Sequence, residues 1–363
     1  MNVHAKNVPE KHFISMGLTP DVTRKRYDVV VSGAGPAGCI AAHLLSRTHS
    51  VLLVEEKQAG AAKPCGGLLA QEGILALADI GLEVPASTTE LPARLSCRIV
   101  DEDHESLEVC LPQTVLNTDR SALNAWFREL VSEQITRLYS FAVIDVQRRG
   151  TALDLVLCGA SQRYPVNCDY LVVAEGAGSR TRRKLVKSLP PFRTATQVVS
   201  PPVRGLESFY MIYSEMITDF YIWVIPKSAH TVVGTGLRRP QGTRQTSVRI
   251  CHFLRERRGW ELSPSEVSRS LLTDFRSETD LWFGDGHILC IGEAAGLVSP
   301  SSGEGISYAV RSASMAAKIV LSDGAACDLR DESHGLIEEL KDKRRRADLI
   351  AQPGQRESYL QLH

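Results

Sequence analysis

The sequence has no excess of charge of either sign, because its 42 Lys and Arg residues balance 42 Asp and Glu residues. A chain with zero formal net charge lacks the positive field that attracts phosphates, so we expect no nucleic-acid partner. The chain also lacks an apolar run of the roughly 18 residues that a membrane-spanning helix needs. Its first residues lack the apolar core of a signal peptide. These absences predict a cytoplasmic protein.

The nine cysteines form no C-x-x-C pair, and their number is odd. Several lie in apolar stretches, where a free cysteine behaves as a small hydrophobic residue. We therefore expect reduced core cysteines, and neither structural disulfides nor a metal site. Hydrophobic residues make up 43% and charged residues 23% of the 363 positions, which is typical of a globular protein with a large core.

The most informative stretch is 27–56, where an apolar run at 29–31 predicts a buried parallel strand. A G-x-G-x-x-G turn follows, in which Gly33 permits the tight turn and Gly35 lets a pyrophosphate approach the backbone. Gly38 lets the next helix, at 39–47, pack closely on the strand. The N–H groups at the start of that helix would hold phosphates. The whole turn is Gly33-Ala34-Gly35-Pro36-Ala37-Gly38.

A second apolar strand, at 51–54, ends in the acidic pair Glu55-Glu56. Glu55 lies 22 positions beyond Gly33, where a carboxylate binds the ribose hydroxyls of an adenine dinucleotide. A glycine turn alone is weak support for such a site. Placed between two strands, with the helix and the acid at these spacings, it predicts a dinucleotide-binding unit.

The rest of the chain divides into two patterns. Helical spacing of apolar residues predicts helices at 119–138 and 303–321, and a charged helix around 335–349. Short apolar stretches rich in aromatic residues and Met predict an antiparallel sheet from strands at 208–217, 220–225 and 230–236. Two further helices are expected at 244–258 and 264–273, and one more buried strand at 287–291.

Glycine-rich motifs occur at three strand ends, and their order resembles the flavoprotein fold of the aromatic hydroxylases and geranylgeranyl reductases. In those families the second motif is D-G-x-x-S-x-x-R and the third is G-D-A-A-G. Here the second motif begins Glu175-Gly176, and the third is Gly292-Glu293-Ala294-Ala295-Gly296, so glutamate replaces both aspartates. The resemblance implies an α/β protein, with a Rossmann-like FAD-binding domain and a second, antiparallel β-sheet substrate domain.

Two further segments are similar to the geranylgeranyl reductase-like family. Lys63-Pro64-Cys65-Gly66-Gly67-Leu68 is similar to its P-C-G-G segment, which approaches the flavin ring. Residues 221–227, YIWVIPK, look like its Y-x-W-x-F-P segment, and V-G-x-G follows at 233–236. The resemblance implies that Cys65, Gly66, Gly67, Arg120, Gly176 and Glu293 contact FAD. Glu293 would accept a hydrogen bond from the ribityl chain, and Glu175 would mainly support its loop.

The likeness covers about 27–320 and implies a division into domains. The FAD-binding domain would be discontinuous, formed by 27–75, 112–185 and 285–322. The substrate domain would comprise 76–111 and 186–284, with an N-terminal extension at 1–26 and a C-terminal tail at 323–363.

A glycine-rich segment, Gly303-Glu304-Gly305-Ile306, opens the helix predicted at 303–321. The N-terminus of a helix placed at the N1/C2 edge of the flavin would stabilise the anionic reduced ring. Gly303 and Gly305 have no side chains to obstruct this approach, so we expect Gly303, Gly305 and Ile306 to contact the cofactor.

Three residues are candidates for the substrate side of the flavin. Tyr221 and Trp223 lie two positions apart on a strand and share one face, so they either wall a substrate cavity or fill the core. The resemblance favours the wall. Cys65, beside Pro64 and two glycines, is expected to face the substrate; as a nucleophile it would need a lowered pKa, for which the sequence shows no cause.

The resemblance thus implies an FAD-dependent oxidoreductase that reduces a double bond in an apolar or isoprenoid-like small molecule. NAD(P)H or another donor would supply the electrons, and a lipid substrate would call for peripheral contact with a membrane. The same scaffold also serves monooxygenases and halogenases that act on aromatic or polyketide substrates. A flavin-binding redox sensor without turnover is a third reading, kept open by the two Asp-to-Glu replacements.

Overall fold

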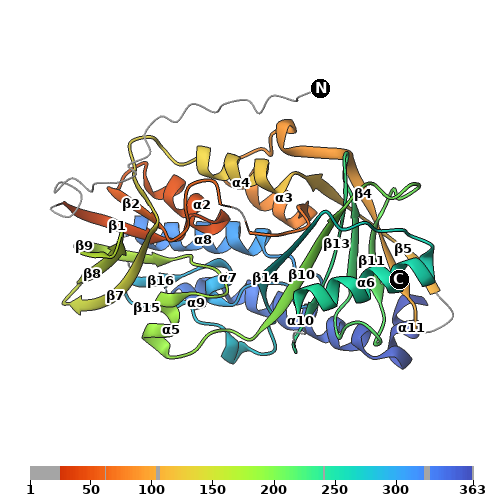
Figure 1. Cartoon of the computed structure of the whole chain (residues 1–363). Coiled ribbons are helices and arrows are strands. Elements are labelled where there is room, and N and C mark those ends of the chain that lie inside the picture. The colour runs from red at the N-terminus through yellow and green to blue at the C-terminus, as the bar shows by residue number, and fades with distance from the viewer. Residues whose placement is uncertain (1–24, 62, 104–106, 240–241, 323–327, 362–363) are drawn as a thin grey trace, which may run out of the picture.

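A computed structural model describes residues 25–61, 63–103, 107–239, 242–322 and 328–361. Almost all of the N-terminal extension expected at 1–26 lies outside these ranges. Two β-sheets lie side by side in the molecule, with helices packed around them (Figure 1). The predicted α/β class, with a Rossmann-like part and a second sheet, is confirmed.

The first sheet has a parallel centre in the order β16-β9-β1-β2-β6. Its middle strand, β1, pairs with β2 on one side and β9 on the other, and Val29, Val30 and Val31 are fully buried. Burial on both faces explains why the sequence shows an unbroken apolar run there. The strands are β1 (Arg26–Ser32), β2 (Val51–Glu55), β6 (Thr136–Tyr139), β9 (Gln162–Val173) and β16 (Ile288–Cys290).

Three antiparallel strands complete this sheet: β15 (Gly284–Asp285) beside β16, and the hairpin of β7 (Phe141–Arg149) and β8 (Ala152–Gly159) beside β9. The helices α2 (Pro36–Leu45) and α8 (Ile306–Leu321) pack against each other and contribute to one core with the parallel strands. This pairing brings the first glycine turn next to the start of α8.

The second sheet has the order β14-β10-β13-β12-β11-β4-β5-β3 and is antiparallel except for the pair β4 and β11. One of its faces packs on α6 (Thr243–Arg258) through Ile250, Phe253 and Leu254. The strands are β3 (Leu68–Leu69), β4 (Thr89–Asp101), β5 (Leu107–Thr118), β10 (Phe192–Ser200), β11 (Phe209–Tyr213), β12 (Ile222–Pro226), β13 (Thr231–Leu237) and β14 (Glu266–Thr273).

On the other face of this sheet, Phe209, Tyr221 and Ile225 form one cluster with Ile350 and Leu360 from the C-terminal helices. These helices lie below the sheet in Figure 1. The remaining helices are α3 (Gln71–Ala78), α4 (Arg120–Glu129), α5 (Arg180–Val186), α7 (Gly292–Ala295), α9 (Leu329–Glu332), α10 (His334–Ala351) and α11 (Pro353–Gln361), with 3₁₀ turns at Ala86–Thr88 and Glu278–Asp280.

Two predicted helices were wrong in extent or type. The segment 264–273 is the strand β14, because it pairs with β10 along its whole length, from Phe192–Thr273 to Val199–Glu266. A neighbouring strand thus overrides a weak local pattern. The helix predicted at 119–138 ends at Glu129, and its last residues instead start β6 in the parallel sheet.

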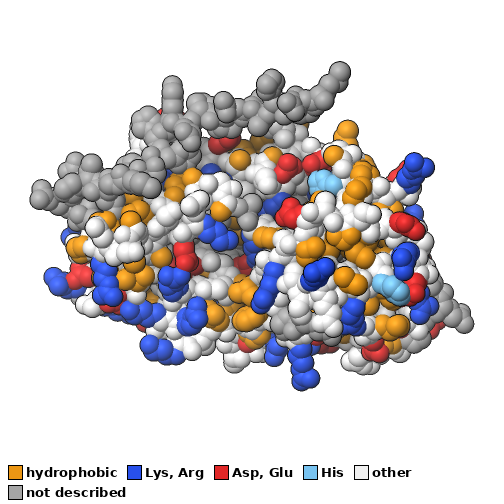
Figure 2. All heavy atoms as spheres, in the orientation of Figure 1, with side chains coloured by type: hydrophobic (Ala, Val, Ile, Leu, Met, Phe, Trp, Pro, Cys, Tyr) orange, Lys and Arg blue, Asp and Glu red, His pale blue; other side chains and the backbone are white. Residues whose placement is uncertain are grey.

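The predicted domain boundary between residues 111 and 112 falls inside β5, which belongs to the second sheet. Otherwise the division into domains stays a prediction. In the described part of the chain, no helix combines the length and the apolar character needed to cross a bilayer. Figure 2 shows basic, acidic and apolar side chains interspersed over one face of the molecule.

Candidate functional site

A cavity of about 450 Å³ is lined by residues from both sheets and from the glycine motifs. The predicted site residues all line it except Gly38, which lies inside α2. The structure therefore brings together residues that are up to 273 positions apart, from Gly33 to Ile306. Those that line the cavity are Gly33, Gly35, Pro36, Ala37, Glu55, Glu56, Cys65, Gly66, Gly67, Arg120, Gly176, Tyr221, Trp223, Glu293, Gly303, Gly305 and Ile306.

The first glycine turn is tightly packed at Gly33 and Gly38 and open at Gly35. Gly33 has a φ of +108°, and a Cβ there would lie 2.3 Å from the carbonyl oxygen of Ala174. A Cβ at Gly38 would lie 1.8 Å from the carbonyl oxygen of Gly33, so strand and helix touch at this point. At Gly35, by contrast, no atom lies within 4 Å of the place where a Cβ would stand. The turn thus leaves room for a phosphate at the N-terminus of α2.

Glu55 is fixed at the edge of this turn. Its Oε2 accepts a hydrogen bond of 2.7 Å from the Ala34 N–H, and its Oε1 accepts one of 2.9 Å from the Lys57 N–H. Each carboxylate oxygen has a second lone pair, which remains available for ribose hydroxyls. The neighbouring Glu56 forms an ion pair with Arg180 at the start of α5.

Glu175 joins the second glycine motif to the first. It accepts hydrogen bonds from the hydroxyls of Ser32, Ser179 and Thr181, the last at 2.6 Å, and from the Thr181 N–H at 2.9 Å. Four donors thus bind this carboxylate and tie the loop to β1, and the supporting role expected of Glu175 stays a prediction.

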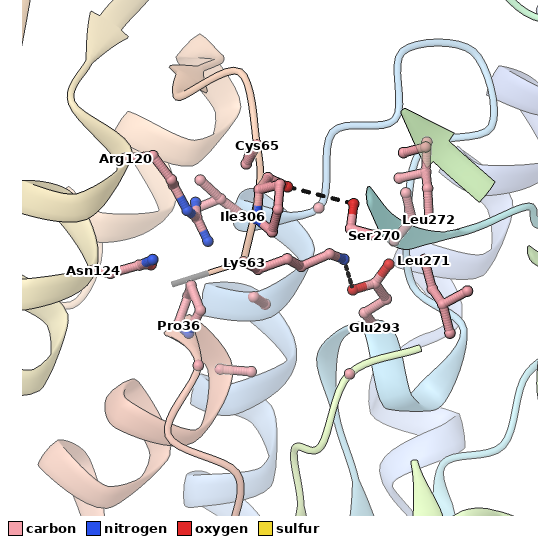
Figure 3. A pocket seen from close by; sticks show the side chains of 18 of the residues that line it. Pro36, Lys63, Cys65, Arg120, Asn124, Ser270, Leu271, Leu272, Glu293 and Ile306 are labelled. Atoms are coloured by element: carbon pink, nitrogen blue, oxygen red, sulfur yellow. Dashed lines mark hydrogen bonds and ion pairs between the residues drawn. The ribbon is translucent and has the colours of Figure 1, made fainter. Parts of the chain in front are cut away.

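Glu293, in the third motif, has both oxygens engaged. Its Oε2 lies 2.6 Å from the ammonium nitrogen of Lys63, and its Oε1 accepts a 3.1 Å hydrogen bond from the Thr273 N–H. Figure 3 shows the Lys63 side chain extended to reach this carboxylate. No sequence pattern indicates a role for Lys63, because its partner lies 230 positions away.

The segment that carries Cys65 is held by its neighbours in the second sheet. The carbonyl oxygen of Gly67 accepts hydrogen bonds from the Thr118 N–H and hydroxyl, at 2.8 Å and 2.7 Å. Below it, the Lys227 ammonium donates to the Asn117 side chain at 2.6 Å and to the Thr118 carbonyl at 2.9 Å. Burial lowers the pKa of Lys227 to about 8. Cys65 itself is exposed.

Aromatic side chains form the wall of the cavity in the second sheet. Tyr221 is 4% exposed and donates a 2.6 Å hydrogen bond to the Ser302 carbonyl. Burial raises its pKa well above the ordinary value, so it stays a neutral phenol. The Trp223 ring lies at 73° to that of Tyr221 and covers Gly234, where a Cβ would be 2.4 Å from the indole. Phe209, Phe220 and Ile225 extend this wall.

A carboxylate caps the start of α8. Glu304 accepts hydrogen bonds from the Ser307 N–H at 2.7 Å and from the Ser307 hydroxyl at 2.6 Å. Burial raises the pKa of Glu304, and the two Ser307 donors oppose this effect. The sequence predicts that the N-terminus of this helix lies at the N1/C2 edge of the flavin. The structure places the carboxyl group of Glu304 at this N-terminus, within the lining of the cavity.

Arg120 has unpaired donors that suit an anionic dinucleotide in this cavity. Its Nε and Nη1 atoms are buried and have no hydrogen-bond partner among the described residues. Such donors are costly to bury unless an acceptor meets them. Figure 3 shows Arg120 and Asn124 directed from α4 toward the cavity. Together with the open space above Gly35 and the free lone pairs of Glu55, these donors fit FAD.

Several lining residues were missed by the sequence analysis. Ser270, Leu271 and Leu272 come from β14, which was predicted as a helix. Phe209 and Phe220 belong to no motif, although both lie in stretches noted as rich in aromatic residues. Their shared face followed only from the pairing of the strands.

The structure combines a parallel sheet, which carries the glycine turn and Glu55, with a second sheet that lines the same cavity. This is the architecture of the FAD-dependent oxidoreductases related to the aromatic hydroxylases. Residues 26–330 match the family described as FAD binding domain, and the chain belongs to that family. The predictions of an FAD-dependent oxidoreductase and of FAD as the cofactor are confirmed at this level.

Protein CbrA of Escherichia coli is 28% identical over 307 residues, which cover 82% of this chain and 85% of that protein. A geranylgeranyl bacteriochlorophyll reductase-like protein from Thermoplasma acidophilum has the same fold, with a TM-score of 0.76 and 19% identity, covering 90% of this chain and 88% of that one. The p-nitrophenol 4-monooxygenase PnpA of Pseudomonas putida gives 0.70 and 14%, covering 93% and 92%. At these identities, the two structures show the fold alone.

Proposed function

We propose that this protein uses FAD to reduce a carbon–carbon double bond in an apolar, isoprenoid-like small molecule. The observation that supports this proposal is the wall of Tyr221, Trp223, Phe209, Phe220 and Ile225 on the second sheet. Aromatic and aliphatic side chains of this kind hold apolar ligands by burial of surface, at about 25 cal/mol per Å².

The chain's own residues would bind, orient and shield the reactants. Bound FAD would supply the two-electron chemistry. The glycine turn, Glu55 and Arg120 would hold the cofactor. Tyr221, neutral and fixed to Ser302, and the Trp223 ring would keep the substrate in place and exclude water. Overall, one alkene, one NAD(P)H or equivalent donor and one proton give the saturated product and the oxidised donor.

The proposal includes a cytoplasmic location. It also includes peripheral contact with a membrane, because an isoprenoid-like substrate is a lipid. This contact would be transient and would bring the open cavity to the bilayer surface.

A second candidate is a monooxygenase acting on an aromatic ring. The cavity wall favours it as well, because the rings of Tyr221 and Trp223 meet edge to face and would suit a flat ligand. The fold shared with p-nitrophenol 4-monooxygenase supports this reading. A halogenase-like enzyme is a narrower version, and a flavin sensor without turnover is the third.

Anaerobic and aerobic reactions of the purified holoprotein separate these functions. The protein is reduced with NADPH or dithionite under nitrogen and mixed with a polyprenyl alcohol, and the product is analysed by mass spectrometry. We expect reoxidation of the flavin together with a gain of two hydrogens by the alcohol. Oxygen consumption that depends on an aromatic substrate would instead establish the monooxygenase. No reduction of the flavin by any donor would favour the sensor.

A further inference from the structure

Lys63 and Glu293 connect two walls of the cavity that are far apart in sequence. Lys63 lies in the segment between β2 and β3, two positions before Cys65, and Glu293 lies in the first turn of α7. The ammonium–carboxylate distance is 2.6 Å. In Figure 3 the Lys63 side chain runs between the start of α2, marked by Pro36, and the segment that carries Leu271.

The same carboxylate also binds the second sheet. The Thr273 N–H at the end of β14 donates to Glu293 Oε1 at 3.1 Å, so one side chain joins three segments. A weaker contact supports this junction, because the Ser270 hydroxyl lies 3.5 Å from the Pro64 carbonyl oxygen. The segment that carries Cys65 is thus attached to the third glycine motif and to β14 at adjacent points.

The charges at this junction are only partly shielded. The side chains of Lys63 and Glu293 are 37% and 18% exposed, and both line the cavity. An ammonium group has three N–H donors. One meets Glu293, and the other two have no partner among the residues that the structure describes. Without Lys63, the Glu293 carboxylate would keep only the Thr273 N–H as a partner among the described residues, in a cavity that would also hold the negatively charged diphosphate of FAD.

We propose that Lys63 is a cofactor-positioning residue, which pairs with Glu293 to fasten the Cys65 segment over the cavity and so retain FAD. Glu293 is one methylene longer than the aspartate of the related families, and the ammonium of Lys63 fixes the direction of that longer side chain. Neither residue retains FAD fully without the other.

A double-mutant cycle tests this coupling. Lys63→Met, Glu293→Gln and the double variant are prepared as apoprotein, and FAD affinity is measured by quenching of flavin fluorescence. We expect each single change to weaken FAD binding roughly three- to tenfold, as for a partly exposed ion pair. The double variant should then bind FAD no more weakly than the weaker single variant.

Lys57→Met is the matched control, because Lys57 also lines the cavity and its side chain forms no ion pair among the described residues. Combined with Glu293→Gln, it should give additive losses. Additive losses for Lys63 and Glu293, or tighter FAD binding by Lys63→Met, would overturn the proposal. Thermal unfolding of each apoprotein separates a lost cofactor contact from a lost fold.

Discussion

The hydroxyl of Tyr221 donates a 2.6 Å hydrogen bond to the carbonyl oxygen of Ser302, and this bond joins the second sheet to the turn before α8. Tyr221 belongs to the aromatic wall, and Ser302 and Gly303 line the same cavity. This buried phenol therefore helps to hold the second sheet against the turn before α8, in addition to the contact between Glu293 and the Thr273 N–H. Tyr221 is only 4% exposed and nevertheless lines the cavity.

Removing the Glu55 carboxylate should weaken FAD binding. We expect Glu55→Ala to lower FAD affinity by about 1–3 kcal/mol, because ribose hydroxyls would lose their acceptor. Titration of the apoprotein with FAD, followed by flavin fluorescence, measures this change. Glu129→Ala is the control, because Glu129 is exposed at the end of α4 and is not among the cavity-lining residues, so FAD affinity should stay unchanged. Equal affinities for the Glu55 variant and the unmodified chain would remove Glu55 from the site.

Trp223 should be required for turnover and not for FAD. We expect Trp223→Ala to reduce substrate turnover strongly while the flavin spectrum and FAD content stay near those of the unmodified protein. Trp223→Phe should retain part of the turnover, because it keeps an aromatic face over Gly234. Loss of FAD or of the folded state in both variants would instead identify Trp223 as a core residue.

The charge of Glu304 should lower the reduction potential of bound FAD. Glu304 places a carboxylate at the N-terminus of α8, where it opposes the helix dipole. Glu304→Gln removes this charge, so the protein should better tolerate the negative charge that reduction places on the flavin. We expect an upward shift of about 30 mV, the equivalent of tenfold for a two-electron couple. Potentiometry with reference dyes measures it.

Glu129→Gln is a suitable control for Glu304, because Glu129 is an exposed carboxylate at the end of α4 and is not among the cavity-lining residues. It should leave the potential almost unchanged. A fall in the potential of the Glu304 variant would contradict the expected sign, and an unchanged potential would place the flavin away from the start of α8.

Lys227 should make the protein more stable at alkaline pH. Its pKa is about 8 in the folded state against 10.5 in the unfolded chain, so the unfolded state binds more protons between these values. The free energy of unfolding should therefore rise as the pH increases from 8 to 10.5, by on the order of 3 kcal/mol from this residue. Below pH 8 the buried charge is a constant cost.

Urea unfolding at pH 7 and pH 10 checks this linkage, with Lys227→Met as the comparison. Other groups titrate in the same range, and the difference between the two proteins isolates Lys227. We expect the gain in stability between the two pH values to be smaller in the variant. The same gain in both proteins would show that Lys227 is not desolvated.

The amino-acid sequence alone determined the first half of the cofactor site. The turn at Gly33, the helix at Pro36 and the carboxylate of Glu55 belong to one continuous strand–helix–strand unit, so their spacing along the chain dictates their spacing in space. The apolar run at 29–31 likewise identified the buried centre of the sheet, because burial on both faces leaves no polar position.

Only the tertiary structure decided how the two halves of the cavity meet. Lys63 and Glu293 are 230 positions apart, and no local pattern announces their pairing. The strand β14 carries an ambiguous local signal, and its pairing with β10 brings Leu271 and Leu272 to the cavity. Glu304 is a similar case. The sequence predicted the start of the helix, whereas only the structure showed that the Glu304 side chain accepts a hydrogen bond from the Ser307 N–H there. Contacts of this kind depend on chain topology, which residue spacing does not encode.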